Sequence, residues 1–341
     1  MGLTVVSVAY PFAPVTADPA GGAEQVLAQL DRALVDAGHR SIVVARSGSA
    51  VAGELVATPA PPGPIDDAAR AAAHREVRAA IGRLAGEADV FHLHGLDFDA
   101  YPPPPGPPCL VTLHLPLAWH SAMALRPGRP RTWLQPVSAD QARRAPKGTA
   151  LLHPIANGVD VERYRPSSPK RDYALVLGRV AREKGFHDAI DAARLAGAPL
   201  RAAGAVFPYP EHRRYFDEEV APRLDGTRIW VGAVAGAVKA RLIAEARVLL
   251  IPSTAPETSS LVAMEALASG TPVIAYRSGA LPEIVEDGVT GLIVDDVAGM
   301  ADAIGRIGAI DPAACRRAAV ERFAVGRTTA AYLDLYHRLA A

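Results

Sequence analysis

The feature that most constrains the fold is a repeated order of buried strand, loop and helix. Residues 3–10 read LTVVSVAY, a short apolar run typical of a buried strand, and the loop after it ends in Gly21 and Gly22. Apolar residues at helical spacing follow over residues 24–35, and SIVVAR then returns as a strand. This order predicts parallel strands joined by a right-handed crossover.

The same order continues along the chain. The first half adds the apolar runs DVFHLHG, CLVTLHL, QPVSA and LLHPIANG, which we interpret as further strand segments. A second series begins at Tyr173 with YALVLGRV and contains the runs PLRAAGA, TRIWVGAV, VLLIPS and TPVIAYR, with helices expected over residues 186–196, 238–246 and 260–269. A chain of 341 residues has the length of two domains. We therefore predict an α/β protein with two Rossmann-like, doubly wound parallel-sheet domains.

The boundary between the two series is predicted at YRPSSPK, where two prolines and two serines interrupt the pattern. We expect a first domain over residues 1–165, a second domain over residues 166–325, and a last amphipathic helix over 326–341 that returns to the first domain. The proline-rich residues 58–66 and 101–108 are expected to be exposed loops. Both sheets would then direct their carboxyl edges at a central cleft, where such sheets bind ligands.

Charge and cysteine content exclude several classes of protein. Lys plus Arg equals Asp plus Glu, at 36 each, so no overall field favours nucleic acid or an anionic membrane. No apolar stretch approaches the roughly 20 residues of a membrane span, and Cys109 and Cys315 are too far apart in sequence to indicate a disulfide framework or a zinc site. We expect a cytoplasmic protein. Arg126, Arg129 and Arg131 either meet an anionic acceptor or belong to a solvated loop.

The segment GRVAREKG lies directly after a predicted strand and directly before a predicted helix. It contains Gly178, Arg179, Lys184 and Gly185. An arginine and a lysine five residues apart on one loop can converge on two phosphates, and the helix that follows adds backbone N–H groups and a positive dipole end. The alternative is a pair of solvated cations on a turn.

The segment PETSSLVAMEALASGTPVI follows the predicted strand VLLIPS and contains two glutamates. Glu257 is expected on the loop and Glu265 inside the helix, with Thr258 or Ser259 as N-cap. Carboxylates accept hydrogen bonds from vicinal hydroxyls, as in a ribose or a hexose, and the helix start between them suits a diphosphate. The alternatives are a helix-dipole partner for Glu257 and a core carboxylate bonded only to protein groups for Glu265.

The first half offers weaker signals. Gly22 precedes a predicted helix, so the backbone can approach a phosphate there, although a plain turn explains the two glycines equally well. His92, His94 and His114 lie near predicted strand ends. An HxH pair puts two rings on one face of a strand, but no third ligand is evident, so we expect no metal. His114 is either a cleft residue or a structural histidine.

These segments together carry a family resemblance. GRVAREKG, the run from Pro256 through SGALPEIVEDGVTGLIV, and NGVD with Tyr164 and Pro166 resemble the retaining family-four glycosyltransferases (glycosyl transferases group 1) of GT-B architecture. The resemblance covers nearly the whole chain. It implies a nucleotide diphosphate-sugar donor, with a UDP-sugar favoured, held by the second domain. It also implies a small-molecule or oligosaccharide acceptor held by the first domain, and no cofactor or essential metal.

The resemblance also implies roles for single residues. Arg179 and Lys184 match the pyrophosphate-binding cations, Glu265 the carboxylate that holds the ribose hydroxyls, Glu257 the carboxylate that touches the donor sugar, and His114 the histidine beside the reacting sugar. The expected catalytic residues are thus His114, Glu257, Arg179 and Lys184. The expected donor-binding residues are Gly22, Gly178, Arg179, Lys184, Glu257, Thr258, Ser259, Ser260, Leu261 and Glu265.

One departure from the family pattern limits what carries over. The family usually has Gly-Phe-Gly after the first glutamate, where this chain has Thr258, Ser259 and Ser260, so the identity of the donor sugar does not follow. The implied mechanism is retention without an enzymic nucleophile, in which the donor phosphate assists front-side attack and the cations stabilise the leaving pyrophosphate. A nucleotide-sugar epimerase of the same fold is the nearest alternative. A phosphorylase and a non-catalytic sugar-binding protein are less favoured.

The biological setting is predicted from composition alone. The abundance of Ala, Gly, Pro and Arg indicates a high-GC actinomycete, and the compact chain without net charge is similar to family members of secondary metabolism, such as oligosaccharide antibiotic biosynthesis. A cell-envelope or thiol-pathway sugar transferase is the rival interpretation.

Overall fold

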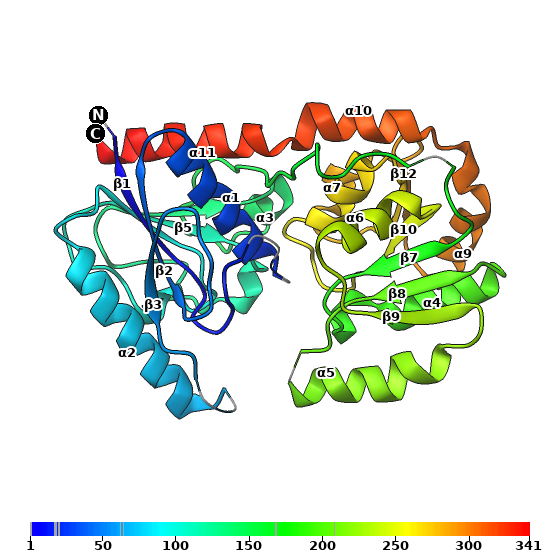
Figure 1. The fold of residues 1–341 in the computed structure, drawn as a ribbon, viewed down its shortest axis with the longest axis horizontal. Helices are drawn as coiled ribbons and strands as arrows, with labels where there is room; N and C mark the ends of the chain where they lie inside the picture. Colours follow the sequence, from blue (N-terminus) through cyan, green and yellow to red (C-terminus); the bar gives the residue numbers. More distant parts are fainter. Residues whose placement is uncertain are drawn as a thin grey trace. The chain divides into compact units, whose positions relative to one another are not determined.

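The computed structural model describes residues 2–16, 19, 21–61, 63, 65–167, 169–207 and 209–341. The chain divides into two compact units, one formed by residues 1–156 and 326–341 and the other by residues 157–325. Each unit contains a six-stranded sheet with flanking helices (Figure 1). The predicted pair of doubly wound parallel sheets is therefore confirmed. The predicted linker, residues 164–170, belongs to the second unit.

The first sheet has the strand order β3-β2-β1-β4-β5-β6, and all neighbouring strands are parallel. The order reverses between β1 and β4, and this switch point is where ligands bind in such sheets. The elements of this unit are β1 (Thr4–Val8), α1 (Gly22–Asp36), β2 (Arg40–Arg46), β3 (Glu54–Thr58), α2 (Asp67–Leu84), β4 (Val90–Leu93), β5 (Cys109–Leu113), β6 (Thr132–Pro136), α3 (Ala139–Arg143) and α11 (Val325–Ala340).

Strand β3 and helix α2 are among the elements of this unit that were not predicted. Strand β3 is an edge strand whose side chains are mostly exposed, so it lacks the apolar run that marks a buried strand. Helix α2 is rich in alanine and arginine and buries only a narrow stripe, so its helical period is weak in the sequence. Conversely, LLHPIANG forms only an isolated bridge between Leu151 and Leu134.

The second sheet repeats the first. Its strand order is β12-β11-β10-β7-β8-β9, again with parallel neighbours, so its switch point lies between β7 and β10. The strands are β7 (Ala174–Leu177), β8 (Leu200–Ala203), β9 (Arg228–Gly232), β10 (Val248–Ile251), β11 (Val273–Tyr276) and β12 (Gly291–Val294). The helices are α4 (Phe186–Leu195), α5 (Pro210–Tyr215), α6 (Gly236–Glu245), α7 (Leu261–Ala268), α8 (Leu281–Ile284), α9 (Val297–Arg306) and α10 (Pro312–Phe323).

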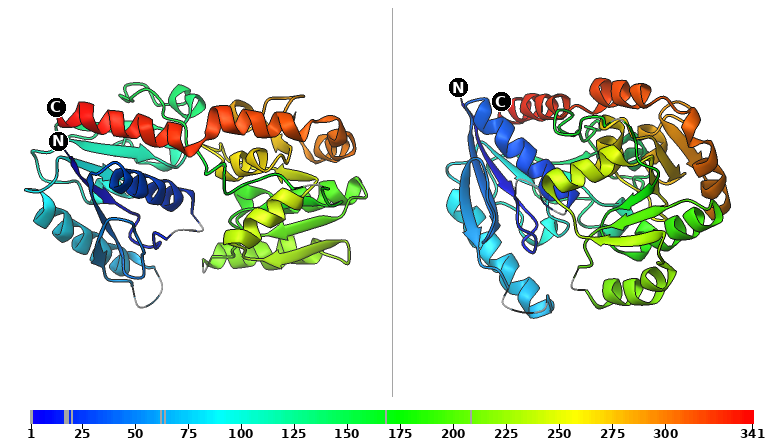
Figure 2. Two further views of the ribbon diagram at one scale, coloured as in Figure 1. Left: turned by 45° about the horizontal axis from the view of Figure 1, so that its top comes forward. Right: turned by 45° about the vertical axis from the view of Figure 1, so that its right-hand side comes forward.

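Helix α11 completes the core of the first unit, although the chain reaches it only after the second unit. Its Tyr332 and Tyr336 are fully buried. The Tyr336 hydroxyl lies 2.7 Å from Nδ1 of His92 on β4, and the Tyr332 hydroxyl lies 2.9 Å from Oγ1 of Thr112 on β5. Figure 2 shows α11 against the sheet of this unit. Within the described ranges, no helix is both long and apolar enough to cross a membrane.

Candidate functional site

Two loops leave the carboxyl ends of β7 and β10, the neighbouring strands at the switch point of the second sheet. The loop after β7 carries GRVAREKG, and the loop after β10 carries the segment from Pro252 to Ser260. The backbone N–H of Thr254 donates to the carbonyl of Glu183 over 2.9 Å, so the two loops are in direct contact. The fold thus brings the two segments singled out from the sequence together at the edge where such sheets bind ligands.

Two glycines allow these loops to approach so closely. Gly185 has a φ of +65°, and a Cβ there would lie 2.2 Å from the carbonyl oxygen of Pro252. Gly279, on the loop after β11, has a φ of +57°, and its Cβ would lie 2.2 Å from the carbonyl oxygen of Glu257. Both positions combine a left-handed backbone with no room for a side chain. The sequence analysis identified Gly185 and missed Gly279.

An ion pair joins the predicted cation of the first loop to the predicted carboxylate of the second. Lys184 Nζ lies 2.6 Å from Glu257 Oε1, and Ser253 Oγ donates to the same oxygen. The Glu257 side chain is 11% exposed and that of Lys184 31%, so the pair interacts more strongly than it would in open water. The contact orients both side chains before any ligand is bound.

Arg179 has a different acidic partner from Lys184. Its Nη2 donates to Glu183 Oε1 over 2.7 Å, within the same loop. Burial and the nearby Arg179 guanidinium lower the pKa of His212 on α5. The two cations are therefore each matched to a carboxylate, and a bound diphosphate would have to compete with Glu183 and Glu257 for them. Gly178 precedes Arg179, and a Cβ there would meet open space.

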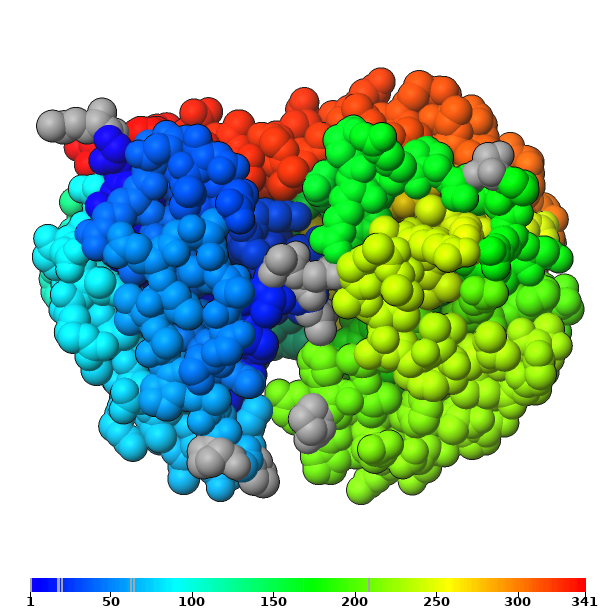
Figure 3. All heavy atoms as spheres, viewed as in Figure 1, coloured from blue at the N-terminus to red at the C-terminus, as the bar shows by residue number. Residues whose placement is uncertain are grey.

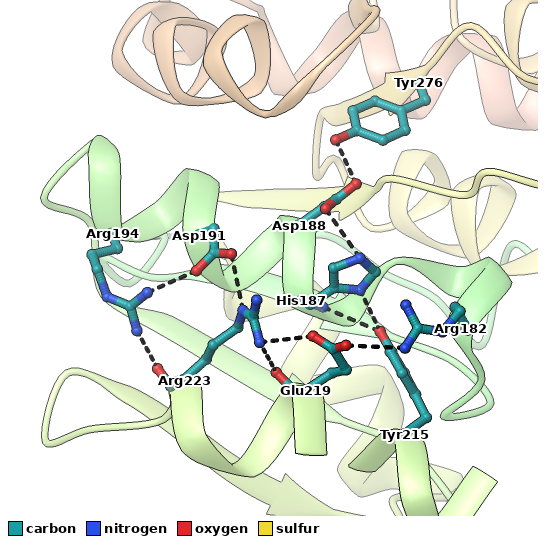
Figure 4. Close-up of polar contacts among 9 residues, drawn as sticks. All are labelled: Arg182, His187, Asp188, Asp191, Arg194, Tyr215, Glu219, Arg223 and Tyr276. Atoms are coloured by element: carbon teal, nitrogen blue, oxygen red, sulfur yellow. Dashed lines mark hydrogen bonds and ion pairs between the residues drawn. The ribbon is translucent and has the colours of Figure 1, made fainter. Parts of the chain in front are cut away.

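The start of α4 differs from the prediction of open backbone N–H groups. The Tyr215 hydroxyl accepts from the backbone N–H of His187 over 3.2 Å and lies 2.7 Å from Nδ1 of the same residue (Figure 4). Burial raises the pKa of Tyr215 to about 12, which keeps the hydroxyl protonated. One N–H group at this helix start is thus already occupied by a side chain.

A charged network supports the loop from outside the site. Arg182, in the middle of GRVAREKG, lies 3.0 Å from Glu219, and Glu219 also pairs with Arg223 (Figure 4). Arg223 in turn pairs with Asp191 on α4. The third cation of the segment therefore pairs with Glu219, whereas Lys184 pairs with Glu257.

Helix α7 begins later than expected. Ser260, not Thr258 or Ser259, is the N-cap residue, and its side chain makes no capping hydrogen bond. Thr258, Ser260 and Leu261 are buried. The buried Oγ of Ser259 has no hydrogen-bond partner among the residues that the structure describes. The segment that replaces the family glycines is thus packed into the unit.

Glu265 is fully buried and has two donors on one oxygen. Oε1 accepts from the Tyr164 hydroxyl over 2.9 Å and from Lys239 Nζ over 2.7 Å. Tyr164 is part of the resemblance noted in the sequence, whereas Lys239 on α6 was missed. No spacing rule links Lys239 to Glu265, because α6 and α7 are separate helices that meet only in the fold.

In the first unit, Gly22 is the exposed first residue of α1. The preceding Gly21 is the N-cap, and a Cβ there would lie 1.9 Å from a carboxylate oxygen of Glu24. Burial raises the pKa of Glu24. A side chain at position 21 would therefore displace the carboxylate of Glu24, which is a structural reason that favours glycine there.

The three histidines form a continuous chain, in which His92 and His94 are buried and His114 is partly buried. His114 Nε2 lies 2.9 Å from His94 Nδ1, and the ring of His94 lies 3.9 Å from that of His92, centroid to centroid. Burial lowers the pKa of His92 and His94 well below the usual range and that of His114 to about 3. His114 is thus neutral at physiological pH. Over the residues covered by the structure, no group of three or more potential ligands could hold a metal ion.

The arginine-rich loop has a structural use. Arg129 donates to the backbone carbonyls of Pro103, Pro104 and Pro107. Arg131 donates to the carbonyl of Leu339 on α11 and Arg126 to that of Lys147. These contacts favour a structural role for the three arginines, in which they hold the loop in place. They disfavour the alternative, in which the arginines bind an anionic acceptor.

A hollow of about 470 Å³ opens beside Ser253 and Thr254, but none of the predicted site residues lines it. Its walls include Asp188, Asp295 and Asp296. Three carboxylates around one hollow are poorly suited to an anionic ligand. The geometry therefore favours the Lys184 and Glu257 contact as the candidate site.

Models of known families match both halves of the chain. The model described as Glycosyltransferase Family 4 matches residues 20–163, and the model described as Glycosyl transferases group 1 matches residues 171–309. A D-inositol 3-phosphate glycosyltransferase of Saccharomonospora viridis is 32% identical over 239 residues, which cover 60% of this chain and 54% of that protein. An alpha-maltose-1-phosphate synthase of Mycobacterium tuberculosis is 28% identical over 226 residues, and the match spans 58% of that protein, so the chain covers slightly more than half the length of these two relatives.

Solved structures resemble the whole chain. AviGT4, a glycosyltransferase involved in avilamycin A biosynthesis, has a TM-score of 0.73 at 26% identity and covers 99% of this chain, with 98% of its own chain aligned. Anabaena HepE in complex with UDP-glucose has a TM-score of 0.77 at 19% identity, with 98% and 100% covered. Two doubly wound sheets, the motifs at the second switch point and these matches agree: the chain belongs to the family-four (group 1) glycosyltransferases and has the GT-B fold.

Proposed function

We propose that this protein is a retaining glycosyltransferase that moves a sugar from a nucleotide diphosphate-sugar, with a UDP-sugar favoured, to a hydroxyl of a small-molecule or oligosaccharide acceptor. The observation that carries the proposal is the contact between Lys184 and Glu257 at the switch point of the second sheet. Membership of the family and the UDP-glucose bound by HepE support it.

In the proposed site, the diphosphate lies against the loops after β7 and β10. Arg179 and Lys184 neutralise its charge, Glu257 holds the donor sugar, and the backbone of Thr258 to Leu261 contacts the donor. Glu265 binds the ribose hydroxyls. Lys184 and Glu257 already contact each other, so the groups that meet the phosphate and the sugar are pre-oriented relative to one another.

In the proposed reaction, the acceptor oxygen forms a bond to the anomeric carbon on the face from which the phosphate oxygen leaves, and the acceptor proton passes to that phosphate oxygen. The anomeric configuration is retained without a covalent enzyme intermediate. Negative charge develops on the departing diphosphate, where Arg179 and Lys184 stabilise it. No cofactor or essential metal takes part in this scheme. His114, neutral because burial lowers its pKa to about 3, acts as a hydrogen-bonding group beside the sugar, not as an acid.

The proposed setting is the biosynthesis of an oligosaccharide antibiotic or similar secondary metabolite, supported by the similarity to AviGT4. A second candidate acceptor is a phosphorylated polyol, because a relative is named a D-inositol 3-phosphate glycosyltransferase. The backbone contacts described above already engage Arg126, Arg129 and Arg131. They therefore favour an acceptor without a phosphate group over the phosphorylated polyol.

A panel of UDP, GDP, ADP and dTDP and their sugars tests the donor assignment by thermal shift. A bound nucleotide raises the unfolding temperature because it stabilises the folded protein. The stabilisation is about 2.7 kcal/mol when the free nucleotide concentration is a hundred times its Kd. The shift should shrink in Glu265→Ala and Lys184→Ala. The assignment fails if no nucleotide stabilises the parent protein or if both variants respond like the parent.

Product analysis separates the proposed transferase from an epimerase. A transferase releases the nucleoside diphosphate together with a glycosylated acceptor, whereas an epimerase changes the sugar with the nucleotide still attached and needs no acceptor. NMR of the anomeric proton of the product then reports the stereochemistry. An inverted product would contradict the retaining mechanism.

A further inference from the structure

The proposed mechanism assigns no role to Lys239, although this residue contacts Glu265. Lys239 lies in the first turn of α6, and its Nζ is 2.7 Å from Glu265 Oε1. Glu265 has no exposed surface and Tyr164, the other donor to Oε1, is 2% exposed, whereas the Lys239 side chain is 15% exposed. Figure 3 shows the α6 segment, in yellow-green, at the surface of the second unit. Of these three side chains, Lys239 is the one that a ligand meets first.

The chemistry of this pair suits a vicinal diol. An ammonium group has three N–H donors, of which the Lys239 group directs one at Glu265 Oε1, and a carboxylate offers only acceptors. Two neighbouring hydroxyls can satisfy such a pair together: one donates to the carboxylate and the oxygen of the other accepts from the ammonium. A sugar that lacks one of the two hydroxyls loses its hydrogen bond to one of these two charged groups.

We propose that Lys239 is a specificity-determining residue of the donor site. Together with Glu265 it binds the 2′,3′-diol of the ribose and so selects a ribonucleoside diphosphate over a deoxyribonucleoside diphosphate such as dTDP. This assignment rests on the proposed function, in which Glu265 faces the ribose. If Lys239 were only the counter-ion of a buried carboxylate, it would stabilise the unit without affecting the choice between the two sugars.

The test compares the Kd of UDP, 2′-deoxy-UDP and 3′-deoxy-UDP by titration calorimetry in the parent, Lys239→Met and Lys239→Arg. A hydrogen bond to a charged group corresponds to about 10- to 100-fold in affinity, so the parent should prefer UDP by that factor over at least one deoxy analogue. Lys239→Met should reduce the preference to a few-fold, and Lys239→Arg, which keeps a cationic donor, should restore most of it.

Lys170→Met is the matched control. Lys170 is also a partly buried lysine of the second unit, but its ammonium group donates to Thr271 Oγ1 and to the carbonyls of Ala244 and Ser269 instead of a carboxylate. This variant should lose stability without changing the ratio of the two Kd values. A thermal unfolding scan of each variant separates lost stability from lost discrimination.

The outcomes distinguish the assignment from the proposed function. If UDP binds and Lys239→Met keeps the parent's preference, the assignment is wrong and the proposed function stands. If the parent binds UDP and both deoxy analogues equally well, the assignment is also wrong, whether or not Lys239→Met folds. If the parent binds no nucleoside diphosphate, the proposed function fails and the assignment fails with it.

Discussion

Lys184 and Arg182 lie two residues apart on one loop, but their side chains have different surroundings. Lys184 contacts Glu257, whereas Arg182 is 64% exposed and pairs with Glu219 on the outer side of the loop. The proposed chemistry places only Lys184 beside the departing diphosphate. A comparison of Lys184 with Arg182 therefore separates the effect of a cation in the site from the effect of a positive charge nearby.

Lys184→Ala should lower kcat by about 100- to 1000-fold, the cost of removing one group that stabilises developing negative charge. Arg182→Ala removes an equal charge two residues away and should leave kcat within a few-fold, because exposed ion pairs contribute little. Steady-state kinetics of the two variants with the same donor and acceptor make the comparison. Equal losses would indicate a general field effect and would contradict a specific contact.

The histidine chain predicts acid sensitivity of the first unit. Burial lowers the pKa of His92, His94 and His114, in the last case from 6.5 to about 3. The unfolded chain takes up protons below pH 6.5 while the folded unit resists them, so this stability is present above pH 6.5 and is lost as the pH falls towards 3. His114 should contribute a loss of about 1.4 kcal/mol per pH unit within this window, and His92 and His94 should add losses of the same sign.

The measurement is thermal unfolding followed by tryptophan fluorescence in Trp230→Phe, which keeps only the tryptophans of the first unit, Trp119 and Trp133. The unfolding temperature should fall between pH 6.5 and pH 5. His114→Asn removes one titrating group and should make the decline shallower. An unchanged slope would mean that His114 is not held neutral in the folded unit.

At the scale of elements, the loop after β11 positions the loop that carries Glu257. The backbone N–H of Ala280 donates to the carbonyl of Glu257 over 2.7 Å, and Gly279 packs directly on the Glu257 backbone. Gly288 also has a positive φ, of +79°, but a Cβ there would meet no atom within 4 Å. Substitutions at these two glycines therefore distinguish the effect of backbone strain, which both share, from the effect of a steric clash with the Glu257 loop, which only Gly279 has.

Gly288→Ala should destabilise the second unit by about 1 to 2 kcal/mol, since a side chain disfavours the left-handed region, and Gly279→Ala should destabilise it by more, because its Cβ also meets the Glu257 backbone. Gly279→Ala should in addition weaken donor binding, because the new methyl group displaces the Glu257 loop. Chemical denaturation gives the first quantity and a donor titration the second. If Gly288→Ala weakens donor binding as much, strain alone is responsible and the positioning role is excluded.

The sequence was most informative where a pattern is local. Buried strands, the loops after β7 and β10 and the helical position of Glu265 follow from apolar runs and from the residues that interrupt them. Edge strand β3 and helix α2 lack such runs and were missed. The contact of Lys239 with Glu265 and the packing of Gly279 on Glu257 arise between separate elements, so no spacing along the chain predicts them. The start of α7 was misplaced because Thr258, Ser259 and Ser260 are all acceptable caps.

For the molecule as a whole, the proposed roles divide between two units, each with its own core. The expected nucleotide contacts beyond Gly22 all come from the second unit. A nucleoside diphosphate alone should therefore stabilise the second unit by mass action more than the first. Whole-protein unfolding is then not a two-state process, and a single transition temperature does not describe it.

Trp230 offers a signal for the second unit. In a variant with Trp119→Phe and Trp133→Phe, saturating UDP should raise the fluorescence transition, whereas in Trp230→Phe the transition of the first unit should move less. Equal shifts in both variants would argue that the nucleotide engages both units with similar energy. The comparison thus locates the nucleotide without requiring an acceptor or a turnover assay.

The placement of α11 also sets the order in which the protein can mature on the ribosome. His92 and Thr112 are made early, but their hydroxyl partners Tyr336 and Tyr332 are translated only after all of the second unit. The first sheet is therefore synthesised before the tyrosines that cover its polar groups. The second unit consists of one continuous segment and can fold as soon as that segment has been translated. We therefore expect the second unit to finish folding before the first, the reverse of the usual tendency of the N-terminal part to fold first.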